Sequence, residues 1–210
     1  MLELLTLVQW LSPAFPTGAF AYSHGLEQAI AEGLVTNEAD FECWLWGILR
    51  HGAGWQDAVL LNLALQKGAD HGALADLARA LAPSAERLLE TTAQGEAFAR
   101  TVSAMTGREI LAAALPVALG QAASALALPR EEIIALAAHA FASNLVSVAT
   151  RAVPLGQTAG QRILAALHPL LSEIAREAAQ AGEESLANAA LAGDLLALRH
   201  ESLDVRIYRT

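Results

Sequence analysis

Histidine, cysteine and carboxylate side chains are the groups of this 210-residue chain that could bind a metal ion or act in catalysis. No two histidines are spaced as His-x-x-x-His, and Cys43 is the single cysteine. His24 and Glu27 lie three residues apart, on one face of a helix, but di-metal bundles need several Glu and His from facing helices. The sequence therefore predicts no metal centre, and leaves open only weak surface binding of a divalent metal. The six histidines are His24, His51, His71, His139, His168 and His200.

Phosphate-binding and nucleophile motifs are also missing from the sequence. Gly156 and Gly160 are not followed by the Lys-Ser/Thr pair of a phosphate loop. No Gly-x-Ser-x-Gly pattern occurs. Cys43 stands beside Trp44, where we expect a buried thiol that forms no thiolate. We expect the carboxylates to follow solvated helix faces. The chain is thus predicted to be no enzyme, with no catalytic residue and no cofactor.

The composition predicts an all-α fold in one domain. The chain is 54% hydrophobic and only 5% aromatic, because Ala and Leu dominate. Both residues favour helices, whereas the usual strand residues are sparse. A chain of this length buries about 70% of its surface without help from disulfides or metals. The net charge is −9 and Lys67 is the only lysine, which argues against nucleic-acid binding.

Prolines, glycines and capping residues divide the chain into about eight to ten helices. Thr36 or Asn37 is a natural N-cap, Pro83 and Ser84 open a later, long helix, and Gly33 and Gly107 are good C-terminal stops. The expected helices are Met1–Leu11, Phe20–Glu32, Asn37–His51, Trp55–Gln66, Asp70–Leu81, Ser84–Met105, Gln157–Gln180 and Glu184–Leu191, together with two low-charge helices.

The two low-charge helices are expected at Ile110–Pro129 and Ile133–Thr150. Their lengths approach a membrane span, but both are rich in Ala and contain several polar residues. We interpret them as central helices of a soluble bundle, apolar on most faces. The N-terminus carries Glu3 and no basic region, unlike a signal peptide. The sequence therefore predicts a soluble, cytoplasmic protein and no membrane partner.

Three segments do not look like plain scaffold. The first, Ser12–Glu27, combines aromatic residues with prolines and glycines, and the second, Arg151–Arg162, is a polar connection between apolar helices. The third is a basic tail, His200–Thr210, with an apolar–charged alternation that suits a segment ordering on a partner. We accordingly divide the chain into a helical domain, residues 1–192, and a docking tail with extended residues, 193–210. From the residues alone, the first segment could instead be a stiff loop, the second a helix hairpin turn and the third a frayed end.

Together these segments resemble the urease accessory protein UreF family. The family's early motif, Ser-Pro-Ala-x-Pro-x-Gly-x-Phe-x-Tyr-Ser-x-Gly-Leu-Glu, is matched at every fixed position from Ser12 to Glu27. Its late loop, Arg-x-x-Pro-Leu-Gly-Gln-x-x-Gly-Gln, is matched from Arg151 to Gln161, and its tail motif is matched from His200 to Arg209 with mild changes. The chain departs from the family at Pro116, since the His-Tyr that often precedes this proline is absent.

The resemblance implies an all-α, often dimeric adaptor that performs no chemistry. Such proteins bind a second accessory protein, called UreD or UreH, and the GTPase UreG, and they support GTP-dependent nickel delivery to apo-urease. Nickel is then cargo and not a resident cofactor. Whether Arg151 or Arg162 reaches the GTPase nucleotide stays open.

The matched positions are the predicted partner-binding residues. They are Ser12, Pro13, Phe15, Pro16, Gly18, Phe20, Tyr22, Ser23, His24, Gly25, Glu27, Arg151, Pro154, Leu155, Gly156, Gln157, Gly160, Gln161, His200, Glu201, Arg206 and Arg209. The alternatives are a helical metal-binding enzyme, an all-α regulator that binds a small apolar ligand, and a membrane-associated helical protein.

Overall fold

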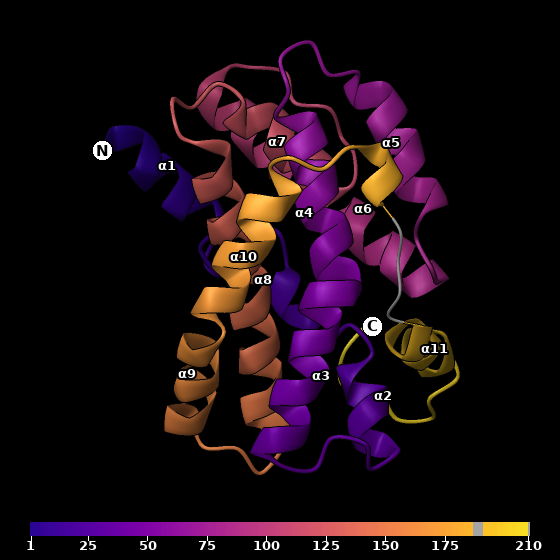
Figure 1. Ribbon diagram of the computed structural model, residues 1–210. Coiled ribbons are helices and arrows are strands. Elements are labelled where there is room, and N and C mark those ends of the chain that lie inside the picture. The colour runs from indigo at the N-terminus through magenta and orange to yellow at the C-terminus, as the bar shows by residue number, and fades with distance from the viewer. Residues whose placement is uncertain (187–190, 210) are drawn as a thin grey trace.

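The computed structural model describes residues 1–186 and 191–209. This part of the chain is helical and contains no strand, which confirms the all-α prediction (Figure 1). The α-helices are α1 (Leu2–Trp10), α2 (Leu26–Ala31), α3 (Glu38–His51), α4 (Ala53–Ala64), α5 (His71–Ala80), α6 (Ala85–Thr106), α7 (Leu115–Ala123), α8 (Arg130–Ala152), α9 (Gln157–Ala166), α10 (His168–Ala178) and α11 (Leu191–His200). Two short 3-10 helices are η1 (Ala19–Ala21) and η2 (Glu183–Ser185).

The predicted capping residues stand at the helix boundaries, as expected. Asn37 caps α3, where its side-chain oxygen accepts hydrogen bonds from the N–H groups of Ala39 (2.9 Å) and Asp40 (3.1 Å). The Ser84 hydroxyl caps α6 in the same way. Gly107 closes α6 with φ of 70°, a left-handed conformation that glycine adopts without strain.

The helix predicted over Phe20–Glu32 is wrong, because the backbone turns left-handed in its middle. His24 has φ of 54° and Gly25 has φ of 75°. These angles interrupt the helical hydrogen bonds and leave η1 before the turn and α2 after it. Gly25 also lies under α11: an added Cβ would come within 3.0 Å of the Ala197 nitrogen.

Three other predicted helices have different bounds. The helix expected over Gln157–Gln180 is split at Leu167, because Pro169 lacks the N–H that a continuous helix would need. The helix expected over Ile110–Pro129 is reduced to α7, and the chain before it passes so close to α6 that a Cβ on Gly95 would meet the Ala113 oxygen. Of Glu184–Leu191, the first residues belong to η2, and residues 187–190 lie outside the described residues.

The core contains one more central helix than the composition suggested. α7 and α8 are central, as predicted, but α4 packs against both of them and against α3, α5 and α10. α8 is long and apolar enough to cross a membrane, yet it packs against α3, α4, α9 and α10. It is therefore a core helix of the bundle, as the polar residues in its sequence indicated.

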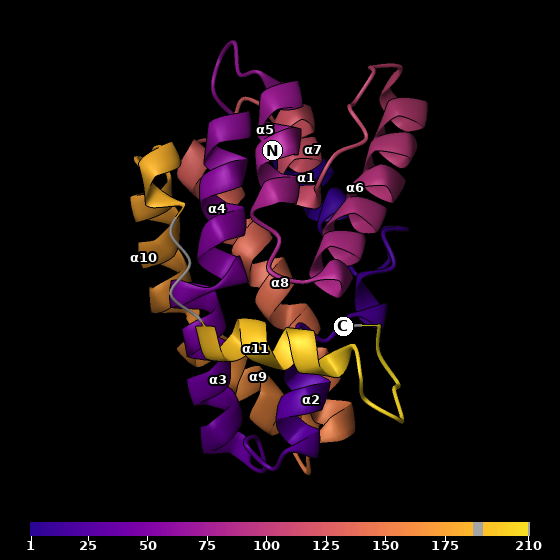
Figure 2. The ribbon, with the colours of Figure 1, turned by 90° about the vertical axis from the view of Figure 1, so that its right-hand side faces the viewer.

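The C-terminal segment is partly helical. Residues 191–200 form α11, which lies across α2 and ends against the start of α6 (Figure 2). Extended character is thus confined to residues 201–209, which have no regular secondary structure and run back over the body. This segment is called the docked tail below.

Candidate partner-docking site

The docked tail is bound to the end of the Ser12–Glu27 segment through one carboxylate. Glu27 accepts hydrogen bonds from the N–H groups of Ile207 (2.8 Å) and Tyr208 (2.9 Å) and from Nε2 of His200 (3.0 Å). The first and third predicted segments, which are far apart in the sequence, therefore form one structure.

His200 is the buried centre of this contact, with no exposed surface. Its Nε2 faces Glu27 and its Nδ1 faces Glu86 of α6 at 2.7 Å. Each ring nitrogen of His200 therefore lies within hydrogen-bond distance of a carboxylate oxygen. Arg206 brings a positive charge to the same contact, 2.8 Å from the other oxygen of Glu86.

The pKa of Glu27 reflects these contacts. Burial alone would raise the pKa of this carboxyl, but hydrogen bonds from His200, Ile207 and Tyr208 outweigh burial and lower the pKa below its ordinary value of 4.5. Glu27 is thus ionised at neutral to mildly acidic pH, and its charge helps to hold the tail.

Further bonds fix the rest of the docked tail. The Arg209 N–H donates to the Ala21 oxygen (2.8 Å), and Tyr208 is 7% exposed. Glu201 accepts from the Ala85 N–H at the start of α6 (3.0 Å). The tail is therefore tied down in the free chain.

The outer face of the docked tail is apolar and basic. Val205 is 79% exposed and Ile207 is 80% exposed. Arg206 and Arg209 alternate with them, and Phe20 on η1 is 65% exposed. We call Phe20, Val205, Arg206, Ile207 and Arg209 the tail face. Exposed apolar side chains on an anchored backbone are a feature of protein-binding surfaces.

His24 anchors the middle of the Ser12–Glu27 segment to two helices. Its Nε2 lies 2.7 Å from Glu90 of α6, and its ring meets Phe141 of α8 edge-on at 4.6 Å. Asn144 of α8 donates to the Ala19 oxygen (3.0 Å). These contacts fix the left-handed turn at His24 and explain how an unfavourable backbone conformation is maintained.

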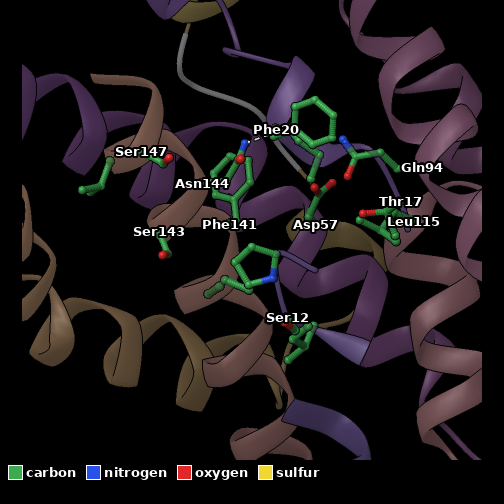
Figure 3. A pocket seen from close by; sticks show the side chains of 18 of the residues that line it. Ser12, Thr17, Phe20, Asp57, Gln94, Leu115, Phe141, Ser143, Asn144 and Ser147 are labelled. Atoms are coloured by element: carbon green, nitrogen blue, oxygen red, sulfur yellow. Dashed lines mark hydrogen bonds between the residues drawn. The ribbon is translucent and has the colours of Figure 1, made fainter. Parts of the chain in front are cut away.

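An elongated groove of about 410 Å³ runs along α8 between the first and second predicted segments. Figure 3 shows Ser143 and Ser147 of α8 at one side of it and Gln94 of α6 at the other. Its lining includes Ser12, Pro13, Thr17 and Phe20 of the first predicted segment and Arg151, Gln157 and Gln161 of the second. The walls are mostly apolar, so the groove offers contact area more than chemistry.

The Arg151–Arg162 loop is held by apolar packing. Leu155 is 5% exposed, and Gly160 lies so close to α8 that a Cβ would come within 2.8 Å of Thr150 and 2.9 Å of Val146. Arg151 donates to the Ser147 hydroxyl (2.7 Å). Pro154 and Gly156 are exposed at the outer edge of the loop.

The predicted partner-binding residues therefore fall into two groups. Those that are buried and shape the surface are Phe15, Tyr22, Ser23, His24, Gly25, Leu155, Gly160 and His200. Those that are exposed or half-buried are Ser12, Pro13, Pro16, Gly18, Phe20, Glu27, Arg151, Pro154, Gly156, Gln157, Gln161, Glu201, Arg206 and Arg209.

Sequence reasoning missed the partners of these residues. Glu86 and Glu90 were expected on a solvated face of α6, but Glu90 is 1% exposed and Glu86 holds His200 and Arg206. Their i, i+4 spacing was the available signal, because it puts both carboxylates on one helix face. The expected burial of Cys43 is wrong, since this residue is exposed.

Comparisons with known proteins agree with the motifs. The UreF family model matches residues 35–168. A urease accessory protein UreF of Cereibacter sphaeroides is 64% identical over 207 residues, covering 99% of this chain and 98% of the relative. Proteins of the same name from Paracoccus denitrificans and Ruegeria pomeroyi are 54% and 41% identical, covering 98% and 99% of this chain and 95% and 97% of the relatives. They are named as accessory proteins, in keeping with a chain that is not itself an enzyme. The chain belongs to the urease accessory protein UreF family.

Proposed function

We propose that this chain is an adaptor in urease maturation. It bridges a UreD/UreH-like accessory protein and a UreG-like GTPase, and so supports GTP-dependent insertion of nickel into apo-urease in the cytoplasm. Membership of the UreF family supports this role. The observation that carries it is the anchored tail beside the Ser12–Glu27 segment, because it offers a preformed surface with exposed apolar side chains.

The tail face is proposed to bind the UreD/UreH-like protein. Ile207 and Val205 expose most of their apolar surface while the backbone beneath them is anchored to Glu27. An anchored segment loses less conformational entropy on binding than a free one, which favours affinity. In this proposal residues 193–210 act as the docking element of the domain formed by residues 1–192.

The Arg151–Arg162 loop is proposed to contact the GTPase, together with the groove side of Ser12–Glu27. The loop is held by close packing, and its groove side carries Arg151, Gln157 and Gln161. Gly156 is the best test position, because an added Cβ meets no atom within 4 Å. A Gly156→Trp variant should fold normally and lose affinity for the GTPase, and normal GTPase binding would count against the assignment.

The predicted homodimer has a candidate surface in α1. This helix projects from the body, and Leu2, Leu5 and Val8 are exposed while Leu7 and Trp10 are buried (Figure 1). Sedimentation of the wild type and of Leu5→Glu tests the idea: the variant should sediment as a monomer, and an unchanged dimer would exclude α1 as the contact.

The whole proposal is tested by co-expression of this chain with the UreD/UreH-like protein, the GTPase and apo-urease. Size exclusion should give one complex containing all four proteins, and addition of nickel, GTP and bicarbonate should activate the urease in it. A chain that elutes alone, or a urease that activates equally without it, would contradict the adaptor role.

The groove keeps one alternative in view. Its volume of about 410 Å³ falls within the range of small-molecule sites. A regulator that binds a small apolar ligand would retain such a ligand through purification, so native mass spectrometry separates the two functions. The adaptor proposal predicts the mass of the polypeptide alone.

A further inference from the structure

Two histidines outside the docking surfaces face each other across the contact between α8 and α10. The ring centres of His139 and His168 are 5.6 Å apart, and the ring planes are inclined by 47°. His139 lies in the middle of α8, and His168 is the first residue of α10. No described residue forms a hydrogen bond with either ring. The pair therefore has ring nitrogens available for a ligand.

The separation of the rings suits a shared metal ion. An imidazole nitrogen binds a divalent zinc-like ion at about 2.1 Å, so two rings on one ion have their centres about 4.5 to 6.5 Å apart, depending on the angle at the metal. The observed 5.6 Å lies inside this interval.

The surroundings of His139 lower the pKa of its ring. Burial in the first place, and repulsion from His168 in the second, lower the pKa of His139 below its ordinary value of 6.5. Neutral imidazole has the lone pair that a metal needs, and a proton competes for the same pair.

We propose that His139 and His168 together bind one late first-row divalent ion, with water in the remaining positions. Imidazole ligands suit nickel, copper and zinc. No group of three or more His, Cys, Asp or Glu side chains in the described residues could hold a metal, so the site is weak and exchanges its ion readily. Such a site fits transient contact with nickel cargo, a link that rests on the proposed function.

Nickel titration of the purified, tag-free chain tests the site directly. Calorimetry with nickel sulfate should give one ion per chain, and His139→Ala or His168→Ala should each weaken binding at least tenfold. His51→Ala is the matched control, because His51 is exposed and packs against Trp46 instead of another histidine. This control should bind nickel like the wild type.

Ring signals in ¹⁵N NMR give an independent readout that does not depend on a substitution. Paramagnetic nickel should broaden the ring signals of His139 and His168 together, before those of the other histidines. Equal affinity in the wild type and both alanine variants, no binding at all, or broadening at other histidines first would overturn the proposal. Because these measurements use the isolated chain, they succeed or fail independently of urease assembly.

Discussion

The docked tail and the Arg151–Arg162 loop are held in place by different physical means. The tail is held by charged and hydrogen-bonded contacts, with Glu27, Glu86 and His200 at their centre. The loop is held by close packing of Leu155 and Gly160 against the core. Polar contacts can be exchanged for contacts with a partner or with water, whereas close packing fixes one shape. The comparison indicates that charge and pH can change the contacts that hold the tail, whereas the loop is held by its shape.

The largest expected effect comes from Glu27→Gln. The amide removes the charge that His200 faces and replaces one acceptor oxygen by a donor. The free energy that keeps the tail closed should fall by about 2 kcal/mol, since bonds to a charged, mostly buried acceptor are lost. Hydrogen exchange of the amides of residues 203–209 measures this change, and the loop amides should keep their protection.

Glu32→Gln is the matched control for that experiment. Glu32 forms an ion pair with Arg199 at 3.1 Å, but the Arg199 side chain is 59% exposed. Solvent screens such exposed pairs, so this one should contribute little to stability. Equal loss of tail protection in both variants would mean that the buried contacts of Glu27 are not what holds the tail.

The loop should respond to a change of shape instead. Gly160→Ala puts a methyl group against the β-branched side chains Thr150 and Val146, which have little rotamer freedom in a helix. We expect a loss of about 1 kcal/mol of global stability and a fall in Tm of about 3 °C. Gly156→Ala, at an open position, should leave Tm unchanged in calorimetry. A Tm for Gly160→Ala equal to that of Gly156→Ala would show that α9 is not closely packed on α8.

Acid should loosen the tail before it affects the loop. The pKa of Glu27 is lower in the folded chain than its ordinary value of 4.5, so its stabilising effect is complete above that value and is lost as pH falls through the lowered pKa. Exchange measured between pH 6 and pH 3, after correction for intrinsic rates, should show residues 203–209 opening first. Simultaneous opening of tail and loop would contradict a separate polar anchor.

The smallest effect should come from Arg162→Ala. Arg162 is 71% exposed and lies 3.5 Å from Glu38, which is itself exposed. Removing such a pair should change the free energy of unfolding by less than about 0.5 kcal/mol in urea denaturation. A larger loss would show that this arginine has a structural role that its exposure does not reveal.

The sequence predicted helices correctly where capping residues next to the helix determine its bounds, as at α3 and α6. It failed where tertiary contacts override local preference, as at the left-handed His24. The motifs identified the Ser12–Glu27 segment and the tail, but nothing in their spacing indicated that Glu27 would bind Ile207 and Tyr208. Long-range pairing of this kind depends on the assembled helices, and so do the positions of Glu86 and Glu90.

Binding of the UreD/UreH-like protein to the tail face tests the central claim most directly. A Val205→Glu/Ile207→Glu variant changes two exposed side chains and leaves the backbone bonds to Glu27 in place. Co-expression and affinity purification should recover wild-type chain with the UreD/UreH-like protein and should recover at least tenfold less of it with the variant, at an unchanged helical circular-dichroism signal and Tm. Equal recovery with both chains would contradict the assignment of the tail face as the docking surface.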